Sequence, residues 1–330
     1  MDGILALAAE NLLSPIILFF ALGFAAALAR SELSVPEAIA KGMSLYLLLA
    51  IGFKGGVSLA NHGVDATLIL ALMAGVILSF ALPFVAFGLL RAMTGLSVID
   101  AAAVAAHYGS ISIVTFVAAS SVLSSAGIAA EGYMVAVAAA MEAPAILSAL
   151  WLVTRASGGA DHGGGGLGSG ILREILLNGS IVLLIGSFAI GAITGQEGLA
   201  KIEAFIVAPF LGVLCLFLLD MGLIAGRGVR EARGLLRPGL FAFGILMPLT
   251  GAAFGLAAGA MLGLSTGGVA LMMTLSASAS YIAVPAAMRV ALPEANPAIY
   301  LTLALGITFP FNLTLGIPIY MAIAQAVTGS

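Results

Sequence analysis

Two short serine-containing patches, at residues 109–114 and 277–282, carry the groups best suited to chemistry in this chain. Their sequences are Gly-Ser-Ile-Ser-Ile-Val and Ala-Ser-Ala-Ser-Tyr-Ile, 168 residues apart, and each lies inside a long hydrophobic segment. A serine hydroxyl can donate a hydrogen bond to an oxyanion, and its oxygen can also bind a hard cation. The residues that we expect to bind an anion are Gly109, Ser110, Ile111, Ser112, Ser278, Ala279 and Ser280.

Polar patches inside hydrophobic segments need a reason, because hydrocarbon holds no water to solvate freed backbone groups. Glycine and serine weaken a helix. If both segments break there, the positive N-terminal ends attract an anion and the free carbonyls attract sodium. The alternative is that the serines only allow close helix packing in lipid. We favour a site because two patches at corresponding positions are the pattern of a secondary transporter, whose substrate lies between two broken helices.

Glu142 lies near the middle of another hydrophobic segment, in the sequence Met-Glu-Ala-Pro. A carboxylate at the bilayer centre costs at least about 2.5 kcal/mol on insertion scales, and a bound sodium ion would offset that cost. The alternative is a protonated or hydrogen-bonded structural acid. The corresponding later region, residues 308–312, offers a hydroxyl, an amide and a carbonyl freed by proline. The candidate sodium ligands are Glu142, Thr115, Ser276, Thr308 and Asn312.

Four further residues are accessory candidates. Lys54 and Asp220 both lie inside hydrophobic segments, but toward opposite membrane faces. At 1.5 Å per residue their depths differ by about 10–15 Å, so we expect each to reach the interface or to pair elsewhere. His107 could sense pH, although we expect a packed neutral side chain. Tyr281, together with Tyr108, could shape the walls of the site.

The composition indicates a membrane protein. Of 330 residues, 62% are hydrophobic and only 8% are charged, whereas a soluble domain has about 25% charged residues. Soluble and disordered proteins are excluded, and a net charge of −3 gives no sign of a nucleic-acid partner. A membrane-spanning helix needs about 20 apolar residues. The sequence therefore predicts an all-α polytopic protein in contact with membrane lipid. Its ten expected spans lie near 13–29, 38–60, 66–91, 98–120, 132–154, 172–194, 202–225, 238–262, 267–290 and 297–326.

Basic residues are unevenly divided between the two sides of these spans. Ten of the twelve lie on one side, Lys201 lies on the other, and Lys54 lies within a span. Cytoplasmic loops carry the excess of lysine and arginine. We therefore expect a multi-pass protein of the cell inner (plasma) membrane, with both termini outside.

The two halves of the chain repeat one pattern. Pro83 and Pro248 are 165 residues apart, Lys54 and Asp220 are 166 apart, and the serine patches are 168 apart. Five spans in each half make the second half enter from the opposite face. This predicts two inverted five-helix repeats, with broken spans four and nine crossing at the site. The expected units are a first repeat at 1–155, a glycine-rich cytoplasmic linker at 156–171 and a second repeat at 172–330.

Four longer strings carry a family resemblance. They are GFKGG at 52–56, HYGSIS at 107–112, SASASYIAVPAAMR at 276–289 and PEANP at 293–297. On these strings the chain resembles the sodium-dependent bicarbonate transporter family (SbtA type) along nearly its whole length. The third string is the most specific. The short linker departs from the family, whose members can carry a longer cytoplasmic insertion there.

The resemblance implies sodium-coupled bicarbonate uptake by alternating access, with an elevator-like movement. Spans one, two, six and seven would form a scaffold or gate domain, and spans three to five and eight to ten a moving core, as in bile-acid symporters. It places bicarbonate at the two patches and sodium near Glu142 and Asn312. It also implies a homotrimer, and some members are inhibited by a small trimeric PII-like protein at the cytoplasmic face.

Other functions stay open at this point. A sodium-coupled symporter of another small carboxylate or organic anion would keep the fold, and an anion channel would show no sodium coupling. A non-transporting receptor would not need two symmetric broken helices. We do not expect an enzyme, because no nucleophile–base pair and no set of catalytic metal ligands is recognisable.

Overall fold

The structure is a computed structural model that describes residues 13–63, 65–142, 144–156, 179–231, 237–281, 284–285, 288 and 292–329. These residues form helices and no strand. Most of the predicted linker at 156–171 lies outside the described residues, as do Ile282 and Ala283 of the second patch. The helices, with η marking π-helical segments, are α2 (Pro15–Leu28), α3 (Glu37–His62), α4 (Ala66–Met93), α5 (Val98–Gly109), α6 (Ile113–Ser125), α7 (Met134–Ala140), α8 (Pro144–Ala156), α10 (Gly179–Ile206), α11 (Phe210–Glu231), α12 (Pro238–Met261), α13 (Thr266–Ala277), α15 (Pro297–Leu301), η1 (Thr302–Thr308), α16 (Phe309–Phe311), η2 (Asn312–Gly316) and α17 (Ile317–Thr328).

Eight helical stretches among the described residues are long and apolar enough to cross a membrane, so the chain is a multi-pass membrane protein. Helices α2 and α13 are also apolar but have only 14 and 12 residues. The ten predicted spans include these two shorter helices, and the count of ten stays a prediction. The eight longer stretches are Glu37–Asn61, Ala66–Met93, Val98–Ser125, Met134–Val153, Val182–Ile206, Phe210–Arg230, Pro238–Met261 and Pro297–Thr328.

The start of the seventh predicted span, at residue 202, is wrong. Helix α10 kinks at Gly195, where φ is 58° and ψ is −153°, a backbone conformation that glycine adopts most readily. The kink coincides with the predicted end of the sixth span at 194. Residues 196–206, which include Glu197 and Lys201, form a second helical piece after it, and α11 begins only at Phe210. A turn at 207–209 separates this piece from α11.

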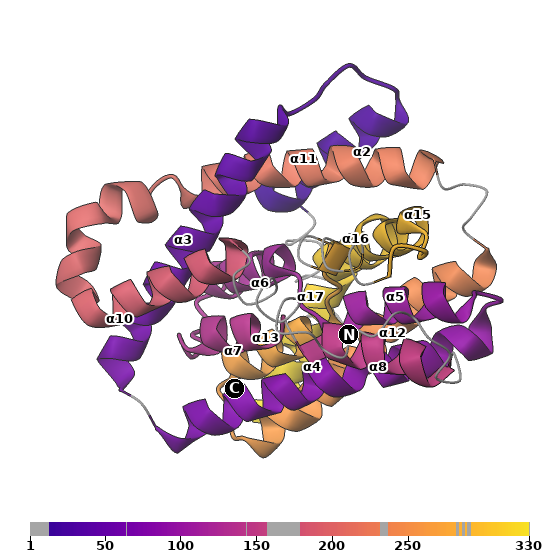
Figure 1. Cartoon of the computed structure of the whole chain (residues 1–330). Helices are drawn as coiled ribbons and strands as arrows, with labels where there is room; N and C mark the ends of the chain where they lie inside the picture. The colour runs from indigo at the N-terminus through magenta and orange to yellow at the C-terminus, as the bar shows by residue number, and fades with distance from the viewer. Residues whose placement is uncertain are drawn as a thin grey trace.

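Helix α2 packs along α11, and α3 packs along α10 (Figure 1). Both contacts depend on glycines that have no room for a side chain. A Cβ atom on Gly56 would collide with the carbonyl of Phe188, and one on Gly222 would collide with the carbonyl of Phe20. Small residues allow this close backbone approach between helices in lipid. The two glycines are 166 residues apart, which is the offset of the predicted repeat.

Helices α5 and α13, which lead to the two serine patches, begin in the same way. Each has 12 residues, a length of about 18 Å. The Ser97 hydroxyl accepts the Asp100 N–H at 3.0 Å, and the Ser265 hydroxyl accepts the Gly268 N–H at 3.1 Å. These caps satisfy N–H groups that the first turn leaves free. Each of these two helices is thus little more than half as long as a hydrocarbon core of about 30 Å is thick.

A carboxylate ties the start of each of these helices to a distant loop. Glu131 accepts hydrogen bonds from the N–H and the hydroxyl of Ser265, at 2.7 and 3.0 Å. Asp100 accepts the N–H of Asn296 at 2.8 Å. A negative charge near a helix N-terminus is favourable. Each contact joins residues from different halves of the chain, so the halves hold one another's patch-bearing helix.

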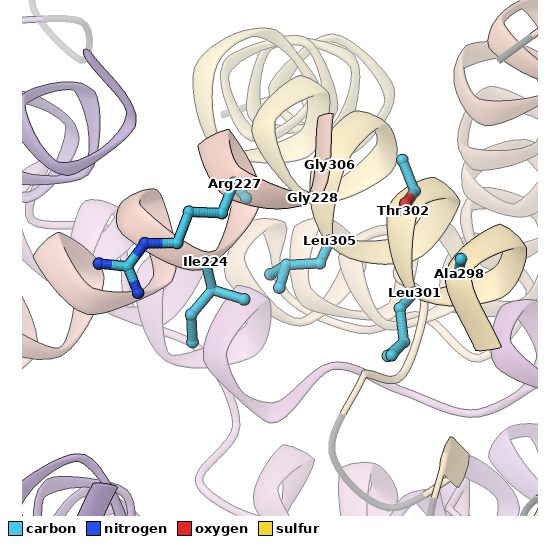
Figure 2. Close-up of a pocket in the computed structure, with 9 residues that line it drawn as sticks. Ile224, Arg227, Gly228, Ala298, Leu301, Thr302, Leu305 and Gly306 are labelled. Carbon is cyan, nitrogen blue, oxygen red and sulfur yellow. The ribbon is translucent and has the colours of Figure 1, made fainter. Parts of the chain in front are cut away.

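A cavity of about 380 Å³ lies between α11 and the segment formed by α15 and η1 (Figure 2). Ile224 and Leu305 are among its apolar lining residues, and Arg227 is its charged residue. The Arg227 guanidinium donates to the Leu33 carbonyl at 2.8 Å, and Figure 2 shows it directed away from η1. The guanidinium group of Arg227 therefore forms its hydrogen bond outside the cavity.

Candidate anion and sodium site

The first serine patch interrupts a helix. Helix α5 ends at Gly109, and both Ser110 and Ser112 have extended backbones before α6 begins. The Ser112 hydroxyl accepts the Thr115 N–H at 3.2 Å and so caps α6. A Cβ atom on Gly109 would collide with Pro83 of α4. The break therefore rests directly against α4.

The second patch ends α13 and meets the first. Ser278, which follows the last helical residue Ala277, has φ −83° and ψ 163°. The Ser112 N–H donates to the Ser278 hydroxyl at 2.9 Å, and the Ser280 N–H donates to the His107 carbonyl at 2.7 Å. The two patches, far apart in sequence, are therefore bonded to each other.

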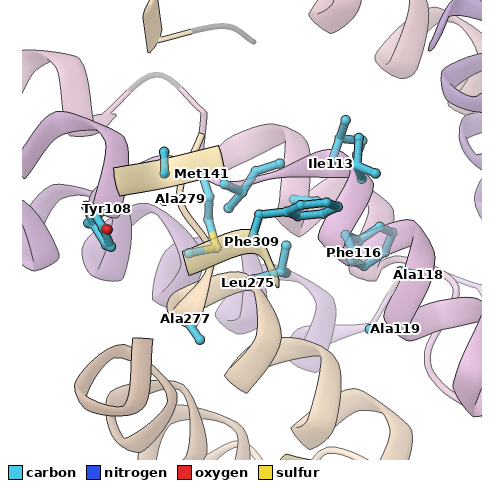
Figure 3. Packing of buried hydrophobic residues seen from close by; sticks show 14 of the residues in the cluster. Tyr108, Ile113, Phe116, Ala118, Ala119, Met141, Leu275, Ala277, Ala279 and Phe309 are labelled. Atoms are coloured by element: carbon cyan, nitrogen blue, oxygen red, sulfur yellow. The ribbon is translucent and has the colours of Figure 1, made fainter. Parts of the chain in front are cut away.

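The meeting point of the patches is enclosed by apolar side chains. Ser110 and Ser278 are each only 1% exposed. Figure 3 shows Ile113 of α6, Ala279 of the second patch and Phe309 of α16 within the surrounding apolar cluster. Electrostatic interactions are stronger in such a low-dielectric setting than in water. A charged ligand there would depend on the few polar groups that the protein supplies.

Several of these polar groups have no partner within the protein. Six buried side-chain polar atoms in the described residues lack a hydrogen bond, and five of them belong to predicted site residues. Leaving such a group unsatisfied costs about 1–3 kcal/mol, and a ligand that bonds to it would remove that cost. The five atoms are Ser110 Oγ, Ser276 Oγ, His107 Nε2, Glu142 Oε2 and the Tyr281 hydroxyl, which lies near the Ser112 side chain without a well-formed hydrogen bond.

Glu142 lies at a third interruption, which we did not predict from the sequence. Helix α7 ends at Ala140 and α8 begins at Pro144, and Glu142 between them is 6% exposed. The Ser79 hydroxyl of α4 donates to the Met141 carbonyl at 2.6 Å and so anchors the interruption. Pro144 was the available signal, because a proline disfavours helical backbone in the residue before it.

The last membrane segment is irregular around two predicted sodium ligands. Thr308 ends the π-helix η1, Asn312 begins the π-helix η2, and Pro310 lies between them. Short π-helical turns are rare and are frequent at functional sites. The sequence indicated that Pro310 would free a backbone carbonyl here. In the structure a π-helical segment, which is wider than an α-helix, lies on each side of this proline.

Thr308 is held by two hydrogen bonds. Its hydroxyl donates to the Gly244 carbonyl at 2.7 Å, so in its 2.6 Å contact with the Tyr108 hydroxyl it must accept. Pro248 explains the free carbonyl, because proline has no N–H to bond to the residue four positions earlier. One oxygen lone pair of Thr308 remains for a cation.

Asn312 is fully buried, and both polar atoms of its side-chain amide form hydrogen bonds. Its Nδ2 donates to the Ala277 carbonyl at 2.8 Å, and its Oδ1 accepts the Tyr320 hydroxyl at 2.8 Å. These two bonds assign the amide's orientation and tie the last segment to the end of α13. We did not identify Tyr320 from the sequence, because a tyrosine among apolar residues gives no distinctive local signal.

Three other predicted residues lie in or next to the two serine patches. Thr115 is buried in the first turn of α6. His107 is fully buried, with Nδ1 at 2.7 Å from the Ala103 carbonyl and its ring stacked on Tyr300 at 4.5 Å. Tyr281 lies edge-on to Phe309, with 5.3 Å between ring centroids. These aromatic contacts form one side of the region where the patches meet.

Lys54 and Asp220 lie on different helices, and the structure describes both. Lys54 of α3 is exposed, with Nζ at 5.0 Å from the centroid of the Phe210 ring. Asp220 of α11 is 6% exposed. The two side chains do not form an ion pair with each other, and neither is among the unpartnered atoms of the central region.

This arrangement offers chemical groups that suit an anion and groups that suit a hard cation. The N-terminus of α6 carries partial positive charge beside Ser110 and Ser112. No group of three or more His, Cys, Asp or Glu side chains gathers in the described part of the chain. The oxygen donors near the breaks are therefore hydroxyls, carbonyls and the carboxylate of Glu142, which suit sodium better than a transition metal.

Comparison with protein families identifies the chain. The profile of the Na+-dependent bicarbonate transporter superfamily matches residues 15–325. This match confirms the resemblance that the sequence strings indicated. A search of curated proteins found no match.

Proposed function

Because the chain belongs to the Na+-dependent bicarbonate transporter superfamily, we propose that it takes up bicarbonate by sodium-coupled symport. The anion binds where the two helix breaks meet. The observation that carries this proposal is the hydrogen bond from the Ser112 N–H to the Ser278 hydroxyl at 2.9 Å, next to buried hydroxyls that have no partner. Polar groups without a partner are costly in the interior of a membrane protein, and this cost supports a ligand at the helix breaks.

Bicarbonate fits the chemistry of this centre. It is a small oxyanion, so its negative oxygens can accept hydrogen bonds from the Ser110 hydroxyl and from free N–H groups at the start of α6. Its own hydroxyl can donate to a protein oxygen. The close contacts between small residues of the two patches leave little room for a large organic anion, which favours bicarbonate over that alternative.

Sodium is the coupling ion in this proposal and is carried with the anion. Glu142 supplies the negative charge, and Ser276 Oγ, Thr115, Thr308 and Asn312 Oδ1 are the neutral oxygen candidates. Sodium bound first would offset the cost of the buried carboxylate. It would also raise the affinity for the anion, because opposite charges attract strongly where water is excluded.

The charge balance sets the sodium requirement. Moving one negative charge into a negative interior costs about 2.3 kcal/mol per 100 mV. One sodium ion cancels that cost, and a second would let the membrane potential drive uptake. The number of sodium ions therefore determines whether transport generates a current.

The transport movement is proposed to be an elevator. Helices α2, α3, α10 and α11 form the scaffold, and the remaining helices carry the site as the moving core of two inverted repeats. The proposal further includes a homotrimer in the plasma membrane, cytoplasmic basic loops and both termini outside. Regulation by a PII-like protein stays a prediction from the family resemblance.

The direct test is labelled bicarbonate uptake into liposomes that contain the purified protein, with and without an inward sodium gradient. We expect saturable uptake that depends on sodium. If another small carboxylate shows saturable uptake and bicarbonate does not, that carboxylate is the substrate and the assignment of bicarbonate is wrong. Uptake indifferent to sodium would contradict symport and indicate a channel or uniporter.

A further inference from the structure

A second cavity, of about 460 Å³, lies between α3, α6, the start of α7 and the start of α11. It is on the face that the charge distribution predicts to be outside. Its lining includes Lys54 and four hydroxyl groups near the end of α6, those of Ser120, Ser121, Ser124 and Ser125. The wall is therefore a mixture of apolar surface, hydroxyls, one ammonium group and one carboxylate, that of Glu131.

The positive charge of Lys54 is available to this cavity. The side chain is exposed, and its Nζ lies 5.0 Å from the centroid of the Phe210 ring. Glu131 also lines the cavity, but its two carboxylate oxygens accept hydrogen bonds from Ser265. In the described part of the chain Lys54 forms no ion pair with Glu131. The cation–π contact keeps the ammonium at the cavity without neutralising it.

The cavity between α11 and η1 provides a contrast. Its charged lining residue, Arg227, donates to the Leu33 carbonyl and points away from η1 (Figure 2). Of these two cavities, the one at Lys54 is therefore the one whose cation has no hydrogen bond to the backbone in the described part of the chain. Glu131 keeps its negative charge when it accepts hydrogen bonds, so the cavity wall carries one charge of each sign, and the Lys54 ammonium attracts an anion locally.

Helix α6 connects the Lys54 cavity to the meeting point of the patches. Ser112 caps its start, and Ser120 and Ser121 line the cavity eight and nine residues later. At 1.5 Å per residue the separation along the helix is about 12–14 Å. An anion held at the cavity would thus lie one short step from the proposed binding centre.

We propose that the Lys54 cavity is an outer holding site for a small monovalent anion, which Lys54 attracts before the anion reaches the helix breaks. The identity of that anion as bicarbonate rests on the proposed function. Lys54 is then a residue that determines the rate of anion capture, and it takes no part in the central site.

The kinetic test compares Lys54→Gln, Lys54→Arg and a control, Lys201→Gln, in the liposome uptake assay. Lys201 is an exposed lysine predicted to be on the same face and does not line the cavity. We expect Lys54→Gln to raise the KM for bicarbonate about threefold to tenfold with little change in the maximal rate. Added inert salt should affect this variant less than the wild type. Lys54→Arg and Lys201→Gln should resemble the wild type. An unchanged KM and salt dependence in Lys54→Gln would overturn the proposal.

A second test reads the charge of the cavity without transport. Ser124→Cys, with Cys215→Ala removing the native cysteine, places one thiol at the cavity. Negatively and positively charged methanethiosulfonate reagents are compared by their reaction rates with it. Lys54→Gln should lower the negative-to-positive rate ratio at least about twofold, since one positive charge is lost. An unchanged ratio would overturn the proposal even if uptake is normal. A lowered ratio in a protein that transports no bicarbonate would support the anion site and contradict only the proposed function.

Discussion

At the scale of single residues, Ser278 joins the two helix breaks. Its hydroxyl accepts the Ser112 N–H at 2.9 Å and donates to the Leu275 carbonyl at 2.9 Å. The Ser110 hydroxyl, by contrast, is buried without a partner. Ser278 therefore shapes the site, and Ser110 has a hydrogen bond to give to a ligand.

We expect Ser278→Ala to raise the KM for bicarbonate about tenfold, because it leaves the buried Ser112 N–H without its acceptor. A tenfold change corresponds to about 1.4 kcal/mol. The control is Thr274→Val in the same helix, whose buried hydroxyl bonds only to the Ala270 carbonyl one turn earlier. Initial rates of uptake over a range of bicarbonate concentrations measure both variants. Equal KM values in wild type and Ser278→Ala would contradict the assignment of the patches to the anion.

At the scale of helices, the breaks are positioned by close contact with α4 and α12. Gly109 abuts Pro83 of α4. On the other side, a Cβ atom on Gly251 of α12 would lie 2.8 Å from the carbonyl carbon of Ser276. A flexible side chain can change rotamer to relieve such a collision, whereas backbone atoms can move only if the helix shifts. The position of α13 relative to α12 therefore depends on the missing side chain of Gly251.

Gly251→Ala should lower the maximal uptake rate by at least about tenfold, since the end of α13 has to shift and packed interiors tolerate little added volume. Gly88→Ala in α4 is the matched control, because a Cβ there would meet nothing within 4 Å. Uptake per folded protein, quantified after size-exclusion chromatography, measures the effect. A wild-type rate in Gly251→Ala would mean that this contact does not position the site.

At the scale of the whole molecule, the proposed site draws on helices from both halves of the chain. The first half supplies the break between α5 and α6 and also Glu142, and the second supplies the end of α13 and Asn312. A ligand that bonds to both halves binds the folded protein and not the unfolded chain. Such binding stabilises the fold, by about 2.7 kcal/mol at a ligand concentration of 100 times Kd.

Sodium should therefore raise the thermal unfolding temperature of the protein in detergent, relative to choline, and bicarbonate should add a further increase only when sodium is present. Glu142→Gln should abolish the sodium-induced increase. It should also stabilise the sodium-free protein, because a neutral amide is cheaper to bury than a carboxylate. Asp220→Asn, a change at another buried carboxylate, should keep the sodium effect. A full sodium effect in Glu142→Gln would contradict its role as the charged ligand.

The membrane class and the family could be predicted from the sequence alone. Hydrophobic content depends on composition, and the four family strings are contiguous runs of residues. The sequence also indicated where helices would be weak, because glycine, serine and proline act on the backbone next to them. The start of the seventh span at 202 was wrong, since hydrophobicity alone did not separate the helical piece after Gly195 from α11.

Only the tertiary structure decided which of these weak points meet and how their polar groups pair. The contact between Ser112 and Ser278 joins residues 166 positions apart, and that between Tyr108 and Thr308 joins residues 200 apart. Sequence periodicity describes neighbours within a helix, so it cannot assign partners across such distances. Whether Ser110 keeps a free hydroxyl while Asn312 is held by Tyr320 depends on how separate helices pack. The candidate residues could therefore be identified from short stretches of sequence. The contacts that bring the two serine patches together depend on how distant helices pack in the fold.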